Sequence, residues 1–153
     1  MQNDSLPKIM NKFSLFILLL FAQLTFAQEA DIRRSIDTFF EGLHQKDTIK
    51  MKSVLAKPMV LHSVDERKDG AVFSVEYAAQ FYRSVASVPK DFSFGEKLLS
   101  CKIQIDGSMA HAWTPYEFYV NGKLSHTGVN SFQLVKEGDK WMIVYCIDTR
   151  RKP

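Results

Sequence analysis

The stretch from Leu98 to Asp148 decides the fold: LLSCKIQIDGSMAHAWTPYEFYVNGKLSHTGVNSFQLVKEGDKWMIVYCID. It contains four strand-like segments, at 98–106, 109–120, 124–136 and 141–148, joined by Asp106-Gly107, Asn121-Gly122 and Glu137-Gly138-Asp139. Glycine, asparagine and aspartate tolerate the positive φ angles that tight hairpins require. We therefore predict four long strands, each paired with the next in an antiparallel meander.

Side chains alternate in character along two of these strands. One pattern sets Cys101, Ile103 and Ile105 against Ser100, Lys102 and Gln104, and another sets Asn130, Phe132 and Leu134 against Ser131 and Gln133. Because successive side chains of a strand point to opposite faces, each pattern predicts one face packed inward.

The last strand differs because it is apolar on both faces. Trp141, Ile143, Tyr145 and Ile147 alternate with Met142, Val144 and Cys146. An apolar sheet face that does not meet the protein's own helices needs another partner. We therefore expect a homodimer formed through the sheet face of the last strands.

Helices are expected before the meander. Apolar residues recur at the spacing of an amphipathic helix over about 30–46, at Ile32, Ile36, Phe39, Phe40 and Leu43. Asp47 is placed to cap a second, short helix that extends through Leu55 and ends before Pro58, because proline disfavours helical geometry in the residue before it.

A hairpin and a third helix complete the expected order of elements. Residues 59–65 read as a strand that turns at Lys68-Asp69-Gly70 into a brief partner at 71–73. Ser74 then caps a helix that Pro89 closes. Its apolar face is predicted to hold Tyr77, Ala78, Phe81, Val85 and Val88.

The N-terminal 27 residues have the features of a signal peptide. An apolar run at 13–22 follows Lys12, and small residues at Thr25 and Ala27 suit a signal peptidase. Met10 is an alternative start. Cleavage after Ala27 leaves 28–153 as a single domain, exported to the periplasm or secreted, with no membrane attachment after cleavage.

Composition limits the partners. The formal net charge is only +3 and the charges are interleaved, so we expect no nucleic-acid partner. The four histidines and two cysteines have no metal-ligand spacing, and we expect no metal and no cofactor. Cys101 and Cys146 fall on the first and last strands of the meander, too far apart for a disulfide unless strong curvature of the sheet closes the gap, and are expected to be buried thiols.

The whole mature chain resembles the nuclear transport factor 2-like superfamily. The resemblance rests on the element order, on Lys46-Asp47 and on a closing pattern at 131–136, 138–141 and Ile143. It implies an α+β cone in which three N-terminal helices pack on a strongly curved antiparallel sheet, as in ketosteroid isomerases, scytalone dehydratase and polyketide cyclases. It also implies a pocket between the helices and the concave sheet face.

The resemblance suggests which residues line that pocket. His62 aligns with the carboxylate base of the isomerases and Asn130 with their protonated acid, whereas Phe39 replaces their tyrosine. His62 points into the cone if the side of its strand that carries Val60 and Val64 faces inward. The alternatives are a core histidine and an amide bound to backbone or water. Further pocket-lining candidates are Phe39, Phe81, Tyr116, Phe132 and Asp148.

Three functions fit these expectations. The first is a non-catalytic domain that binds an unknown apolar small molecule. The second is a cofactor-independent isomerase, dehydratase or cyclase acting on an apolar carbonyl compound, with His62 as base and Asn130 as oxyanion donor. The third is a dimeric assembly module whose cone is filled by its own side chains. The volume of the cone, and whether His62 and Asn130 converge in it, distinguish the three.

Overall fold

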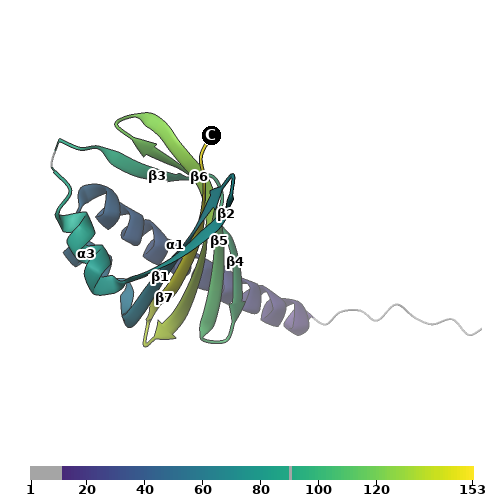
Figure 1. Ribbon diagram of the computed structural model, residues 1–153. Coiled ribbons are helices and arrows are strands. Elements are labelled where there is room, and N and C mark those ends of the chain that lie inside the picture. Colours follow the sequence, from purple (N-terminus) through teal and green to yellow (C-terminus); the bar gives the residue numbers. More distant parts are fainter. Residues whose placement is uncertain (1–11, 90) are drawn as a thin grey trace, which may run out of the picture.

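Three helices and a curved seven-stranded sheet form the structure, a computed structural model (Figure 1). It describes the backbone of residues 12–89 and 91–153, and the side chains of 26–89 and 91–153. The alternative start at Met10 lies outside these residues. The elements are α1 (Lys12–Gln45), α2 (Thr48–Lys52), β1 (Leu55–Arg67), β2 (Gly70–Tyr77), α3 (Ala78–Ala86), β3 (Phe94–Leu98), β4 (Lys102–Asp106), β5 (Met109–Val120), β6 (Lys123–Glu137) and β7 (Lys140–Arg151).

The sheet has the order β2-β1-β7-β6-β5-β3, and β4 also pairs with β5. The hairpins β5–β6 and β6–β7 are antiparallel, as the turn residues predicted. The sheet as a whole is mixed rather than antiparallel, because β1 runs parallel to β7. The expected α+β cone is confirmed, with α1 and α3 on the concave side of the sheet (Figure 1).

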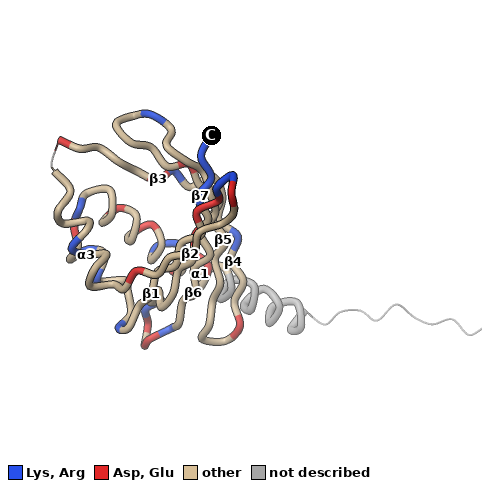
Figure 2. The backbone as a smooth tube through the Cα atoms, in the orientation of Figure 1, with Lys and Arg blue, Asp and Glu red and all other residues tan. Residues whose placement is uncertain are grey.

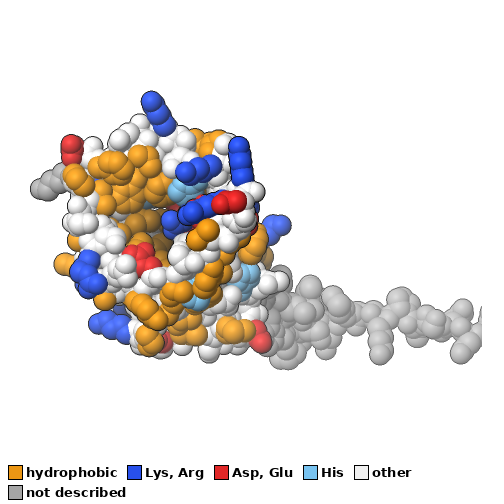
Figure 3. Space-filling model, in the orientation of Figure 1, with side chains coloured by type: hydrophobic (Ala, Val, Ile, Leu, Met, Phe, Trp, Pro, Cys, Tyr) orange, Lys and Arg blue, Asp and Glu red, His pale blue; other side chains and the backbone are white. Residues whose placement is uncertain are grey.

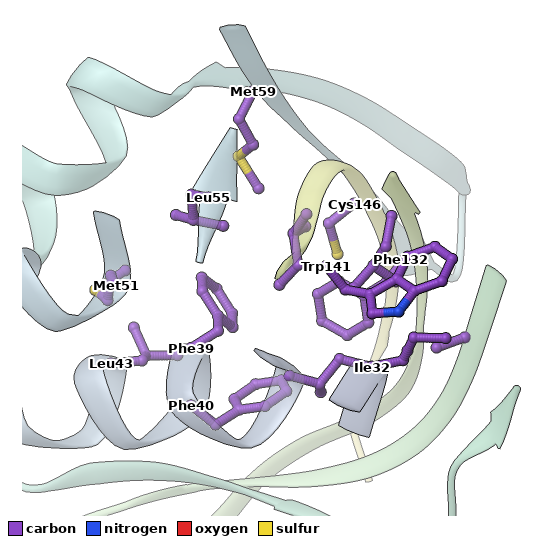
Figure 4. Packing of buried hydrophobic residues seen from close by; sticks show 14 of the residues in the cluster. Ile32, Phe39, Phe40, Leu43, Met51, Leu55, Met59, Phe132, Trp141 and Cys146 are labelled. Atoms are coloured by element: carbon purple, nitrogen blue, oxygen red, sulfur yellow. The ribbon is translucent and has the colours of Figure 1, made fainter. Parts of the chain in front are cut away.

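The predicted apolar face of the first helix is the centre of the core. Ile32, Ile36, Phe39, Phe40 and Leu43 are all buried there. Phe39 and Phe40 both meet the ring of Phe132 edge to face, at centroid distances of 6.0 and 5.9 Å. Figure 4 shows these rings packed with Met51, Leu55 and Cys146. The helix begins earlier than predicted, since its backbone is helical from Lys12.

The second helix is capped as predicted but is shorter. The carboxylate of Asp47 accepts hydrogen bonds from the backbone N–H groups of Ile49 and Lys50, both at 3.0 Å. The helix ends at Lys52, and Leu55 already begins β1. Pro58 does not stop a helix; it lies in an irregular part of β1, between the pairs that Leu55 and Val60 make with β7. Proline has no N–H to donate to a strand ladder, and it is tolerated there because the regular pairing is interrupted.

The prediction for the start of the third helix was wrong. Ser74 lies within β2, which continues to Tyr77, and α3 begins at Ala78 without a side-chain cap. Eight residue pairs join β2 to β1, and this extended pairing outweighs the local capping preference of one serine. Tyr77 is consequently exposed instead of lying on the helix face, whereas Phe81 and Val85 pack on the core as expected.

The first predicted strand of the meander is divided into β3 and β4. Leu98 pairs with Tyr116 and Lys102 pairs with Trp113, so three residues on one side face only Thr114 and Pro115 on the other. Pro115 has no N–H to continue the ladder, which favours a break at this point. Cys101 falls in the break and is half-buried; it and the buried Cys146 are both free cysteines.

A bulge in β7 decides which of its residues face the helices. Ile143 pairs with Leu134 and Tyr145 with Gln133, which leaves Val144 as an extra residue. The buried positions therefore change from Trp141 and Ile143 before the bulge to Cys146 and Asp148 after it. The simple alternation predicted for this strand holds only up to Ile143.

Candidate functional site

An open cavity of about 370 Å³ lies between the helices and the concave face of the sheet. Figure 3 shows the hollow with apolar side chains around it. Its apolar wall includes Phe39, Phe40 and Leu43 from α1 and Phe81 and Val85 from α3, and most of its polar groups come from the sheet. All five predicted pocket-lining residues border it, namely Phe39, Phe81, Tyr116, Phe132 and Asp148.

The sheet side of the cavity presents a carboxyl group, Glu96. Strand β3 directs Phe94, Glu96 and Leu98 to the same face, so this carboxyl lies between apolar neighbours. Its Oε1 accepts a hydrogen bond of 2.5 Å from Nδ2 of the buried Asn130, and Nδ2 lies 3.3 Å from Oγ1 of Thr114. Both N–H donors of the amide are therefore engaged with protein groups.

Glu96 holds its proton near neutral pH. Burial raises the pKa of Glu96 to about 8, the hydrogen bond from Asn130 opposes the rise, and the charge of Asp148 adds to it. The surface that Glu96 retains faces the cavity. A neutral carboxyl group can donate its O–H, so the cavity contains a donor that ionised glutamate would lack.

A second polar cluster surrounds Asp148. Only 8% of this residue is exposed, and its carboxylate accepts hydrogen bonds from Ser63 Oγ, from Tyr116 Oη at 3.2 Å and from Arg150 Nε at 2.8 Å. Arg150 also donates to Ser63 Oγ at 2.9 Å. The negative charge of Asp148 is thus balanced within the protein.

Two aromatic groups complete this end of the cavity. Burial, followed by the charges of Asp148 and Glu96, raises the pKa of Tyr116, whose hydroxyl donates to the Thr149 carbonyl at 2.9 Å. His126 stacks on Phe118 at a centroid distance of 4.7 Å. Burial, with a contribution from Arg150, lowers the pKa of His126, so its ring is neutral at pH 7.

His62 and Asn130 do not converge. His62 borders the cavity, but its side of β1 faces outward, because the neighbouring Leu61 packs on the core and Ser63 binds Asp148. The His62 Nδ1 lies 2.7 Å from the hydroxyl of Tyr145, and its ring meets Phe73 at a centroid distance of 4.9 Å. The condition under which His62 would point into the cone is not met.

Sequence reasoning missed Glu96 and Ser63. The sequence contained a signal for Glu96. Phe94, Glu96 and Leu98 share one face of a strand, and a carboxylate between two apolar side chains is costly to bury. Ser63 gave no such signal, because it meets Asp148 only through the pairing of β1 with β7, which sets Ser63 opposite Asp148. Arg150 follows Asp148 by two residues on β7, so both side chains lie on the same strand face.

The described residues include no group of three or more histidine, cysteine, aspartate or glutamate side chains placed to hold a metal ion. Likewise, no helix in the described part of the chain is long and apolar enough to cross a membrane. Neither finding bears on residues 1–11.

Comparisons with known proteins agree on the fold. No family model and no curated protein matches the sequence. Among solved structures, a nuclear transport factor 2-like protein of unknown function from Methylobacillus flagellatus is 19% identical, with a TM-score of 0.60, over 82% of this chain and 93% of that one. A nuclear transport factor 2-like protein from Cytophaga hutchinsonii has a TM-score of 0.66 at 10% identity, over 81% of this chain and 98% of that one.

A further similar structure is the β subunit of a proposed aromatic-ring-hydroxylating dioxygenase from Novosphingobium aromaticivorans. It has a TM-score of 0.69 at 8% identity and covers 85% of this chain and 93% of its own. The fold and the cavity define an α+β cone with an open interior. This cone is the nuclear transport factor 2-like fold.

Proposed function

We propose that this protein binds a small, largely apolar molecule in the cavity between its helices and its sheet. The observation that carries the proposal is the open volume of about 370 Å³, which falls in the usual range of ligand pockets, about 300–1,000 Å³. A cone used for assembly alone would be expected to be filled, because packed cores leave few voids larger than a water molecule.

The polar groups of the cavity favour a neutral ligand with a hydrogen-bond acceptor. Arg150 balances Asp148, and Glu96 is protonated near pH 7, so the polar cluster around Asp148 and Glu96 carries no net charge. The O–H of Glu96 matches an acceptor such as a carbonyl oxygen. The phenylalanines of α1 and α3 would contact the apolar remainder of the ligand.

Export is part of the same proposal. Signal-peptide cleavage after Ala27 would deliver residues 28–153 to the periplasm or the medium. Among the residues whose side chains the structure describes, from 26 onward, the first buried core residue is Ile32, which lies after the proposed cleavage point. N-terminal sequencing of the protein from cell fractions tests this step, and a chain that still begins at Met1 or Met10 would contradict it.

A second candidate function is proton transfer catalysed by Glu96. The observation that favours it is the pKa of about 8 for Glu96, near the value suited to a general acid or base at neutral pH. A proposed dehydratase from Streptomyces avermitilis, 13% identical with a TM-score of 0.62, shares the fold, but a shared fold does not imply shared chemistry. The outward orientation of His62 does not support the suggestion that His62 is the base.

Native mass spectrometry of the protein purified from its own cells tests the binding proposal. We expect a defined small molecule retained on the folded chain. A titration with Prodan, a neutral naphthalene ketone whose fluorescence reports an apolar environment, then tests the site. In Leu61→Trp the larger ring enters the cavity, and we expect at least tenfold weaker Prodan binding in a folded protein.

Leu99→Trp is the matched control, because Leu99 is exposed away from the cavity. Its Prodan affinity should equal that of the wild type. Full Prodan binding in Leu61→Trp would rule out the cavity as the site. A ligand whose covalent structure changes during incubation with the protein would instead favour the Glu96 enzyme.

A further inference from the structure

Strand β2 forms one edge of the sheet, and in the described part of the chain it pairs with β1 alone. Its eight residue pairs with β1 follow one another without a register shift. The outer side of β2 therefore presents a regular row of backbone N–H and C=O groups that no described strand pairs with. Such a row is a template on which a further strand can add.

The strand lacks the features that usually protect a sheet edge. Edge strands are commonly short, charged, bulged or interrupted by proline. Strand β2 has eight residues, no proline and no bulge, and its one charged residue is Glu76. Figure 2 shows that the charges of the β1–β2 hairpin gather at its turn. Four large apolar side chains of β2 are between 42% and 66% exposed, namely Val72, Phe73, Val75 and Tyr77.

The opposite edge of the same sheet is protected. It consists of two strands of five residues each, β3 and β4, with a break between them. Lys97, Lys102 and Asp106 are exposed along it. Charges and a break in the ladder both oppose the addition of another strand. The chain thus protects one edge and leaves the other open, which marks β2 as an interaction site.

We propose that the outer edge of β2 binds an extended peptide segment of a partner protein as an added strand. In this mode the backbone groups give affinity and the side chains give specificity. Phe73, Val75 and Tyr77 share the convex face of β2, where the Phe73 ring meets that of His62 at a centroid distance of 4.9 Å. β-branched or aromatic side chains of the partner would pair with them across the edge.

Glu76 indicates that the partner also carries a positive charge. It is half-buried on the other face of β2, where it borders the cavity. Its carboxylate accepts a hydrogen bond of 3.2 Å from Ser84, and it forms no ion pair with any described residue. A lysine or arginine directly across the edge would pair with it. A second copy of β2 could not supply this group, because residues 70–77 contain neither lysine nor arginine. Charge complementarity therefore favours a different chain.

Fluorescence polarisation with a labelled peptide tests the proposal. The probe is Val-Lys-Val-Thr-Val-Thr-Val, blocked at its N- and C-termini. In antiparallel pairing its lysine lies across from Glu76 when its first valine lies across from Tyr77. We expect saturable binding to the wild-type protein in the micromolar range, since a flexible peptide loses entropy when it is ordered. A copy methylated at every backbone nitrogen cannot donate to β2 and should not bind.

An exchange of charges locates the peptide on β2. Glu76→Lys sets two positive charges opposite each other, and we expect it to weaken binding of the probe at least about tenfold. The same variant should prefer a peptide that has glutamate in place of the lysine. Glu137→Lys is the control, because it makes the same change at the exposed end of β6, and it should bind the probe as the wild type does. Circular dichroism verifies that both variants are folded.

Sedimentation velocity with the unlabelled probe tests the other possible occupant. We expect the probe to leave the oligomeric state unchanged. A wild-type dimer that the probe dissociates would assign the edge to a second copy and overturn the proposal. A wild-type protein that does not bind the probe, equal binding of the methylated copy, or a folded Glu76→Lys protein with unchanged preference would also overturn it. None of these measurements requires a ligand in the cavity.

Discussion

The amide nitrogen of Asn130 lies 2.5 Å from Oε1 of Glu96, and this contact joins β6 to β3 across β5. Through this contact the amide of Asn130 holds the protonated carboxyl group of Glu96 at the wall of the cavity. The N–H groups of Asn130 are directed at Glu96 and Thr114, whereas an oxyanion donor would direct them at a ligand. The group available to a ligand is the carboxyl of Glu96.

The proton on Glu96 should make stability depend on pH. Its pKa is about 8 in the folded protein, above the ordinary 4.5, so between these values the folded state holds a proton that the unfolded state has lost. Stability should therefore fall as pH rises from about 5 to 8, by at most about 1.4 kcal/mol per pH unit.

Urea unfolding at a series of pH values measures this slope. Glu96→Gln keeps the shape of the side chain but cannot ionise. We therefore expect its unfolding free energy to change less with pH between 5 and 8 than that of the wild type. Glu66→Gln changes an exposed carboxylate and should keep the wild-type slope. An unchanged slope in Glu96→Gln would show that Glu96 is ionised throughout.

Glu96 should also make ligand binding depend on pH. Above pH 8 its O–H is lost, and a carboxylate would repel a carbonyl oxygen. We expect Prodan to bind roughly five- to tenfold more weakly at pH 9 than at pH 7, which corresponds to a hydrogen bond of about 1 kcal/mol. The same naphthylamine without its ketone should bind equally at both pH values, and equal loss for both probes would refute a hydrogen bond from Glu96.

Asp148 should be important for stability. In Asp148→Asn the buried charge that accepts from Tyr116, Ser63 and Arg150 is lost, and we expect a cost of about 2–3 kcal/mol, typical of hydrogen bonds to a charged group. Urea unfolding measures the difference. Asp31→Asn removes an exposed ion pair with Arg34 and should cost less than about 1 kcal/mol. Equal costs would mean that the Asp148 cluster is no more than a surface pair.

Gly128 should tolerate no side chain. A Cβ at this position would overlap the carbonyl oxygen of Thr149 and lie 2.8 Å from the Tyr116 ring. We expect Gly128→Ala to destabilise the protein by about 3 kcal/mol or more, measured as a lower midpoint of thermal or urea unfolding. Gly95→Ala is the control, because its nearest contact would be 3.7 Å from His44. A Gly128→Ala protein as stable as the wild type would contradict the close approach of β6 and β7.

Local patterns predicted most of the fold. The turn residues between 98 and 148 and the apolar face from Ile32 to Leu43 were identified because hairpin turns and amphipathic helices depend on neighbouring residues. The predictions failed where distant partners decided the outcome. Pairing with β1 kept Ser74 in a strand, and Pro115 on β5 helped to divide the strand opposite it.

The sequence by itself determined the order of elements, the inward face of the meander and an apolar pocket wall, because each follows from side-chain periodicity. Tertiary structure alone decided that Ser63 meets Asp148 and that Glu96 meets Asn130 at the cavity. One unpaired residue, Val144, turns Asp148 inward and leaves Tyr145 outside with His62. A bulge arises from the register between two strands, and register is a property of the pair that neither strand encodes alone.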